Sequence, residues 1–243
     1  MEIQGLAFLP CLWVIWTFAG VITTLSMTII GGHIEKFIPY ISDTGTNYPE
    51  SIIFTVVFSV SAALGVCTMY VMYKRMTSSI DVEDSHPIAQ KILLLIGRLS
   101  CIGILSLALV QTKLHPNWHF GATLLAITSG LVYNISQAFY LYAVCKSKRP
   151  IRHLRAALCL VTLLTFLTLV ACKIVFIFAC NGGHCEQVTV VSAVGEWVIA
   201  ATLMLNNLTY IPYFQELSMK CPSNLQQDWI CLRERVNAGP EYP

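Results

Sequence analysis

Six long apolar segments constrain the fold of this chain more than any other feature of its sequence. They lie at about residues 6–30, 52–73, 92–112, 119–145, 156–180 and 188–213. A helix needs about 18 or more apolar residues to cross the ~30 Å hydrocarbon core of a bilayer, and each segment is of comparable length. Only 12% of the residues are charged and 56% are hydrophobic, which excludes an ordinary soluble globule.

We therefore predict an all-α integral membrane protein, a six-transmembrane helical bundle, as a single domain over residues 1–213. Residues 214–243 are short, mixed in charge and contain three prolines, so we expect a tail that frays. Lys and Arg are concentrated in the connections after the second and fourth segments and in this tail. Because short basic loops remain in the cytosol, both termini and the tail are predicted to be cytosolic.

The stretch "KSKRPIRHLR", residues 146–155, is the densest basic segment of the chain. Basic side chains next to a membrane are attracted to anionic lipids of the cytosolic leaflet. We therefore predict contacts with lipid headgroups, and with anionic phospholipids in particular. The alternative is that these charges only set the topology. The candidate contact residues are Lys146, Lys148, Arg149, Arg152 and Arg155.

Glu196 is the most informative of the three charged residues inside the predicted helices. Arg98 and Lys173 are long enough to reach an interface, whereas the carboxylate of Glu196 is too short and too deep. It therefore needs a partner, and Lys173 and His119 are the candidates. Three roles remain open: a structural pair, an acid–base site acting on a lipid headgroup, and ion or proton translocation.

The tripeptide Asp43-Thr44-Gly45 matches the catalytic tripeptide of aspartic proteases. Those enzymes need two carboxylates that share one proton, and this chain has neither a second copy nor paired aspartates within helices. An ordered turn is the better interpretation, because Asp bonds nearby backbone N–H groups and Gly tolerates positive φ. Glu50 would then open the second helix. We expect this lumenal turn to lie over the helix ends, near His119 and above Glu196.

These residues define a candidate lumenal functional site: Asp43, Glu50, His119, Glu196 and Trp197. No complete catalytic set is visible, so no catalytic residue, metal or cofactor is predicted. His115 and His119 have the spacing of a helical zinc site, but Pro116 breaks the geometry. Cys180 and Cys185 flank a predicted lumenal turn, where a disulfide or two free thiols are both compatible with the sequence.

The chain resembles the damage-regulated autophagy modulator (DRAM) family, within a wider Frag, DRAM, Sfk and TMEM150-type superfamily. The resemblance rests on "GLAFLP" at 5–10, "PYISDTGT" at 39–46 followed by "PES", "HFGA" at 119–122 and "GEW" at 195–197. It implies a multi-pass membrane protein of the lysosome or endosome that promotes autophagy, sometimes coupled to apoptosis. It brings no established catalytic residues.

The leading hypothesis is a non-enzymatic membrane protein that modulates autophagy through membrane lipids or through unidentified membrane or autophagy proteins. Two alternatives remain open. One is a lumenal lipid-remodelling enzyme or lipid transporter that uses Glu196 and His119. The other is an organiser of a phosphoinositide kinase at the plasma membrane. No nucleic-acid partner is expected.

Overall fold

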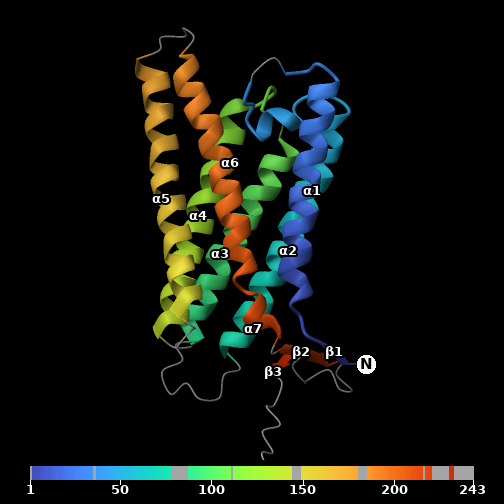
Figure 1. Ribbon diagram of the computed structural model, residues 1–243, viewed down its shortest axis with the longest axis vertical. Helices are drawn as coiled ribbons and strands as arrows, with labels where there is room; N and C mark the ends of the chain where they lie inside the picture. The colour runs from blue at the N-terminus through green and yellow to red at the C-terminus, as the bar shows by residue number, and fades with distance from the viewer. Residues whose placement is uncertain are drawn as a thin grey trace, which may run out of the picture.

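A computed structural model of the chain describes residues 2–34, 37–77, 87–110, 112–143, 149–179, 185–215, 217–220 and 230–232. Six long helices run alternately up and down beside one another (Figure 1). All six are long and apolar enough to cross a membrane, which confirms the predicted six-helix bundle. They are α1 (Phe8–Ile30), α2 (Glu50–Thr77), α3 (Pro87–Leu109), α4 (Pro116–Ala143), α5 (Arg149–Phe178) and α6 (Glu186–Leu208).

Several helix ends differ from the prediction by about five residues, among them the start of α3 at Pro87 rather than near residue 92. At two other ends, local chemistry outweighs the apolar pattern. Helix α5 begins at Arg149 rather than near residue 156, and Pro150 in its first turn is compatible with a helix start. Helix α6 ends at Leu208 rather than near residue 213. Pro212 lacks an N–H and would clash with the carbonyl of Leu208 in a continuous helix. The chain therefore breaks and resumes as the short helix α7 (Ile211–Gln215).

The two ends of the bundle are built differently, and we name them as they are drawn in Figure 1. At the upper end, the 3-10 helix η1 (Ser42–Gly45) lies between α1 and α2. At the lower end, β2 (Leu217–Lys220) pairs in antiparallel fashion with both β1 (Glu2–Gln4) and β3 (Ile230–Leu232). This small sheet was not predicted, and the expectation that the tail frays is wrong for the residues of β2 and β3.

Side-chain donors and small residues join neighbouring helices inside the bundle. The indole N–H of Trp13 on α1 donates to the Ser61 carbonyl of α2 over 2.6 Å. The Ser100 hydroxyl of α3 donates to the Ala126 carbonyl of α4 over 2.8 Å. A Cβ at Gly103 would lie 2.6 Å from the Ala126 nitrogen, so only glycine allows α3 and α4 to approach this closely. Such small-residue contacts are the usual basis of helix packing in membranes.

An apolar core at the lower end anchors the start of the chain to its end. The Leu6 N–H donates to the Phe214 carbonyl over 3.0 Å, and both side chains are buried. Side chains from the N-terminal segment, α1, α2, α4, the link between α6 and α7, α7 and β2 complete this core. Its buried members are Leu6, Leu9, Val71, Met72, Met76, Tyr133, Leu141, Tyr210, Tyr213, Phe214 and Leu217.

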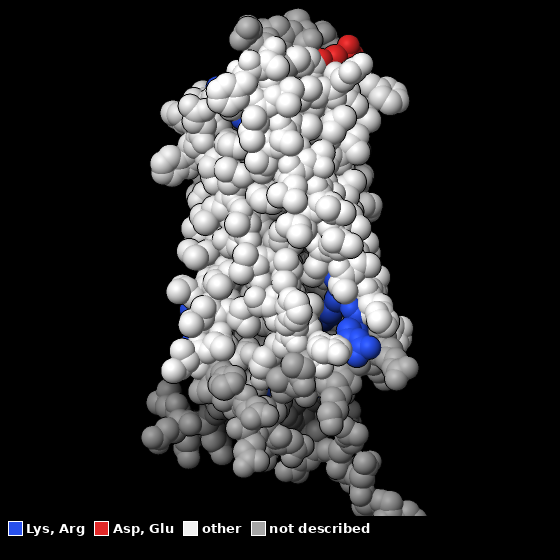
Figure 2. Space-filling view, turned by 90° about the vertical axis from the view of Figure 1, so that its left-hand side faces the viewer, with Lys and Arg blue, Asp and Glu red and all other residues white. Residues whose placement is uncertain are grey.

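Charged side chains on one face of the molecule lie mainly toward its two ends. On the face that Figure 2 shows, most of the long central belt is uncharged. The largest group of Lys and Arg atoms lies toward the lower end, and the Asp and Glu atoms lie at the upper end. This distribution suits a protein whose central belt is surrounded by lipid.

Candidate functional site

The predicted turn at Asp43-Thr44-Gly45 is an ordered element of the upper end. Residues Ser42–Gly45 form the 3-10 helix η1, and the Thr44 hydroxyl donates to the Ile41 carbonyl over 2.7 Å. Thr44 is completely buried, although it lies in a connection between two helices. The interpretation as a structured turn is therefore confirmed.

Helices α1 and α2 hold this turn from one side. The Thr24 and Thr44 hydroxyl oxygens lie 3.0 Å apart, and the Thr28 hydroxyl donates to the Thr44 carbonyl over 3.2 Å. On the α2 side, the Phe54 ring packs so closely on Gly45 that an added Cβ would overlap it. The threonines on α1 are spaced by one helical turn, so both hydroxyls face the same residue.

Helix α6 holds the turn from the other side through Glu196 and Trp197. The Ile41 N–H donates to the Glu196 carboxylate over 3.0 Å, and Ser42 also hydrogen-bonds this carboxylate through its N–H and its hydroxyl. The Trp197 indole N–H donates to the Pro39 carbonyl over 2.9 Å. The expectation that the turn lies above Glu196 is confirmed. Two adjacent side chains of α6 thus clamp the start of the turn.

The two predicted partners of Glu196, Lys173 and His119, make other contacts in the structure. The Lys173 ammonium lies over the rings of Phe120 and Phe176, with its Nζ 4.9 and 5.8 Å from the two centroids. His119 is buried, and its Nδ1 lies 2.8 Å from the Val110 carbonyl at the end of α3. The partners that the structure shows are the Ile41 and Ser42 N–H groups and the Ser42 hydroxyl. Sequence reasoning missed them because backbone N–H groups carry no residue-type signal.

Tyr40 is held between the turn and α6, and its environment changes its acidity. Burial raises the pKa of the Tyr40 hydroxyl above its usual value. The nearby negative charges of Glu196 and Asp43 raise the pKa further, whereas a hydrogen bond with the Ser192 side chain opposes the shift. The phenol therefore stays neutral over the physiological range.

Glu50 and His33 form a second polar contact at this end. The His33 Nδ1 lies 2.9 Å from the Glu50 carboxylate. Glu50 opens α2, as predicted, and is only 2% exposed. The imidazole therefore covers a buried carboxylate at the start of a helix, where negative charge is favoured. His33 was not among the predicted site residues. The sequence signal that could have indicated it is its position just after α1, since the end of α1 and the start of α2 lie at the same end of the bundle.

A cleft of about 450 Å³ opens beside this pair at the upper end. The connection between α1 and α2 contributes His33, Asp43 and Asn47 to its lining, and the connection between α3 and α4 contributes Lys113. The Lys113 ammonium donates to the Asn47 side-chain carbonyl over 2.6 Å, which ties the two connections together. The lining thus contains one acidic side chain, Asp43, and one basic side chain, Lys113.

The predicted basic segment lies at the lower end, far along the bundle from the turn. Lys146 and Lys148 lie outside the described residues, and Arg149 begins α5. The Arg152 guanidinium lies 4.7 Å from the centroid of the Tyr142 ring. Arg155 is only 3% exposed, so its guanidinium is not presented to an exterior lipid headgroup in this structure.

Of the predicted cysteine pair, Cys185 is disulfide-bonded, and Cys180 lies outside the described residues. Within the described ranges, no group of three or more His, Cys, Asp or Glu side chains is arranged to hold a metal ion. The upper end is thus built from a clamped turn, a buried carboxylate paired with a partly exposed imidazole, and a polar cleft. Such an arrangement can present a fixed polar surface to another molecule.

Comparison with known proteins places the chain in a family over almost its whole length. Residues 5–217 match the family described as the Frag1/DRAM/Sfk1/Cwh43P N-terminal domain. This range includes the turn, the residues that clamp it and all six long helices. No solved structure matches the chain.

Several curated proteins are similar to this chain. DNA damage-regulated autophagy modulator protein 1 of Mus musculus is 32% identical, over 93% of this chain and 98% of the relative. The protein of the same name from Xenopus laevis is 33% identical, with the same two coverages. Modulator of macroautophagy TMEM150B-A of Xenopus laevis is 25% identical over 82% of each chain. The chain therefore belongs to the Frag1/DRAM/Sfk1 family of multi-pass membrane proteins.

Proposed function

We propose that this protein is a non-enzymatic membrane protein that modulates autophagy through contacts with lipids or other proteins. The observation that carries this proposal is similarity, over nearly the full length, to proteins named as autophagy modulators. The structure offers a physical basis for it. At the upper end Glu196 and His119 each hydrogen-bond backbone groups of different segments, which suits fixed architecture better than an acid–base pair.

We propose the lysosomal or endosomal membrane as its location, with both termini in the cytosol. The two described ends of the chain lie together at the lower end, where β1 pairs with β2. The basic residues near the lower ends of α2 and α5 favour the cytosol for this end. The clamped turn and the cleft would then face the lumen, and lumenal lipids or lumenal parts of membrane proteins would be the molecules that meet them.

Loss and replacement of the protein test the proposed function. A tagged copy should overlap with lysosomal or endosomal markers, and removal of the protein should change autophagic flux. Flux is measured as the difference in lipidated autophagosome marker with and without lysosomal inhibition. A plasma-membrane distribution together with unchanged flux would overturn both the location and the function.

Selective permeabilisation tests the orientation. Epitopes at each terminus should be accessible to antibody after the plasma membrane alone is permeabilised. An epitope beside Asn47, in the upper connection, should become accessible only when internal membranes are opened as well. The reverse pattern would place the turn in the cytosol.

A further inference from the structure

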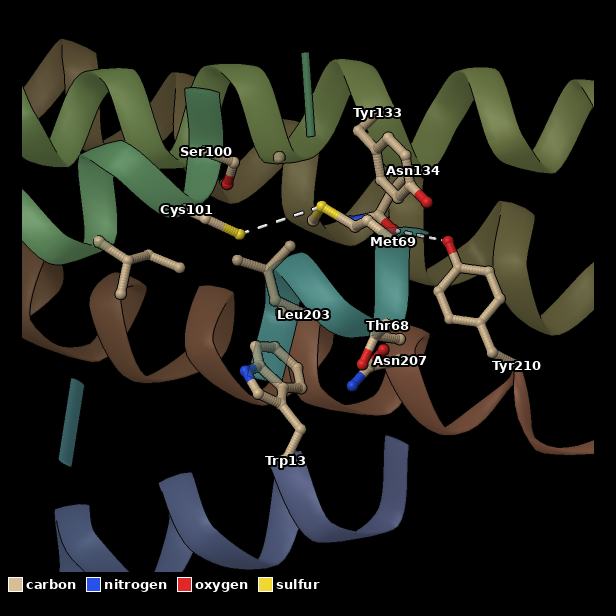
Figure 3. A pocket seen from close by; sticks show the side chains of 13 residues that line it. Trp13, Thr68, Met69, Ser100, Cys101, Tyr133, Asn134, Leu203, Asn207 and Tyr210 are labelled. Atoms are coloured by element: carbon tan, nitrogen blue, oxygen red, sulfur yellow. Dashed lines mark hydrogen bonds between the residues drawn. The ribbon is translucent and has the colours of Figure 1, made fainter. Parts of the chain in front are cut away.

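A small cavity lies inside the bundle, well away from the clamped turn. Its volume is about 60 Å³, and α1, α2, α3, α4 and α6 all contribute to its wall. Figure 3 shows the side chains that line it. All of these helices belong to the membrane-spanning set, so the cavity lies within the part of the molecule that lipid surrounds.

The wall of the cavity is mostly apolar, but six polar side chains contribute to it: Thr68, Ser100, Tyr133, Asn134, Asn207 and Tyr210. The Tyr210 hydroxyl lies 3.5 Å from the Asn134 side-chain carbonyl. Figure 3 draws this contact and the contact between the Cys101 and Met69 sulfur atoms as dashed lines. The hydroxyl of Thr68 donates to its own helix, at the Leu64 carbonyl. The Thr68 oxygen therefore retains lone pairs that can accept a further hydrogen bond.

Asn207 supplies an unsatisfied donor to the same cavity. Asn207 is only 8% exposed, and its Nδ2 has no hydrogen-bond partner among the described residues. Figure 3 shows this amide beside Thr68 on the cavity wall. Lipid cannot satisfy an amide donor, so a partner inside the cavity is required.

The size and charge of the cavity restrict what this partner is. A lipid headgroup or metabolite needs a pocket of several hundred Å³. The lining residues include no carboxylate, and the Arg155 guanidinium lies 4.4 Å from the centroid of the Tyr210 ring, so a cation is disfavoured. A small neutral molecule that both donates and accepts hydrogen bonds fits the wall. A bound water needs about 10–15 Å³ of such volume, which leaves room for about four.

We propose that this cavity is an internal water-binding site, in which bound water links Asn207 of α6 to polar groups of α2, α3 and α4. The site is separate from the clamped turn and goes beyond the proposed function. The waters complete the hydrogen bonding of the Asn207 amide and fill a space that the surrounding side chains leave between five helices.

Radiolytic hydroxyl-radical labelling of the full-length protein in lipid nanodiscs tests this proposal. Radicals formed from bound water oxidise the side chains that touch it, and sulfur is the most reactive target. The chain offers a matched pair of buried thiols: Cys101, 3% exposed, lines the cavity, whereas Cys159, 6% exposed, lies outside it. We expect Cys101 to be oxidised several-fold faster than Cys159, as read by mass spectrometry. Equal rates would overturn the proposal.

Two variants test whether the cavity is the source of the labelling. Asn207→Leu removes the unsatisfied donor and adds apolar volume, so oxidation of Cys101 should fall toward that of Cys159. Gly65→Ala places a Cβ in the cavity 3.0 Å from the Cys101 sulfur and should have the same effect if Asn207→Leu does not fold. Unchanged Cys101 oxidation in a folded variant would assign the labelling to another source of radicals and overturn the proposal.

Discussion

At the scale of single residues, the carboxylate of Glu196 is held by backbone N–H groups rather than by a cation. A buried carboxyl group needs hydrogen-bond partners, and the Ile41 N–H, the Ser42 N–H and the Ser42 hydroxyl supply them at the start of η1. The sequence marks Glu196 as unusual because it is an acidic residue in an apolar segment. It does not mark its partners, since every residue except proline has a backbone N–H.

Gly45 is the residue of the turn with the least freedom to change. We predict that Gly45→Ala lowers the free energy of unfolding by about 1–3 kcal/mol, because the added methyl group would overlap the Phe54 ring. Thermal unfolding in detergent measures the loss. Gly121→Ala is the control, since a Cβ there meets no atom within 4 Å. Equal midpoints for the two variants would contradict the packing of Phe54 on the turn.

Tyr40 predicts a pH dependence of stability. Because burial raises the pKa of its hydroxyl in the folded protein, the folded state keeps a proton that the unfolded state loses. This contribution is fully present below the unfolded pKa of about 10 and is lost as the pH rises through the folded pKa. The melting temperature should therefore fall more steeply above about pH 10 in the unmodified protein than in Tyr40→Phe. Parallel curves for the two proteins would contradict the burial of this phenol.

At the scale of elements, apolar segments predict the six helices because each must satisfy its own backbone within lipid. The prediction missed the break after Leu208 because the apolar segment continues past it, although Pro212 could have indicated it. The strands β1, β2 and β3 are three or four residues long, which is too short for any alternating pattern. The turn at 42–45 was predicted from its residue types, whereas the bonds that clamp it to α6 come from residues 155 and 158 positions away.

Arg155 connects α5 to the break between α6 and α7. Its guanidinium donates to the Thr209 carbonyl over 2.9 Å and lies over the Tyr210 ring. Arg155→Met should lower the free energy of unfolding by about 2 kcal/mol, because the carbonyl loses a charged donor in a buried position. Arg152→Met should cost about 0.5–1 kcal/mol, because only a half-buried cation–π contact is lost.

Chemical denaturation of both arginine variants in the same detergent gives these two costs directly. Equal losses would show that burial of Arg155 against the α6–α7 break adds nothing to stability. A larger loss for Arg152→Met would contradict the arrangement at the lower end.

At the scale of the whole molecule, the two ends are secured by different means. The lower end joins the start and end of the chain through a small sheet and an apolar core. The upper end joins α1, α2 and α6 through a turn that carries the most specific sequence signature, "PYISDTGT". The segment that carries the family signature is thus also the turn that Glu196 and Trp197 clamp.

Rescue of autophagic flux tests most directly whether this clamped turn carries the function. Cells that lack the protein would receive either the unmodified chain, the double variant Glu196→Leu/Trp197→Phe, or Lys173→Gln, at matched expression and location. Lys173→Gln is the control, because it removes a charge on α5 that contacts Phe120 and Phe176 rather than the turn. We predict that the control restores flux and that the double variant does not. Full rescue by a double variant that reaches the same membrane would contradict the account.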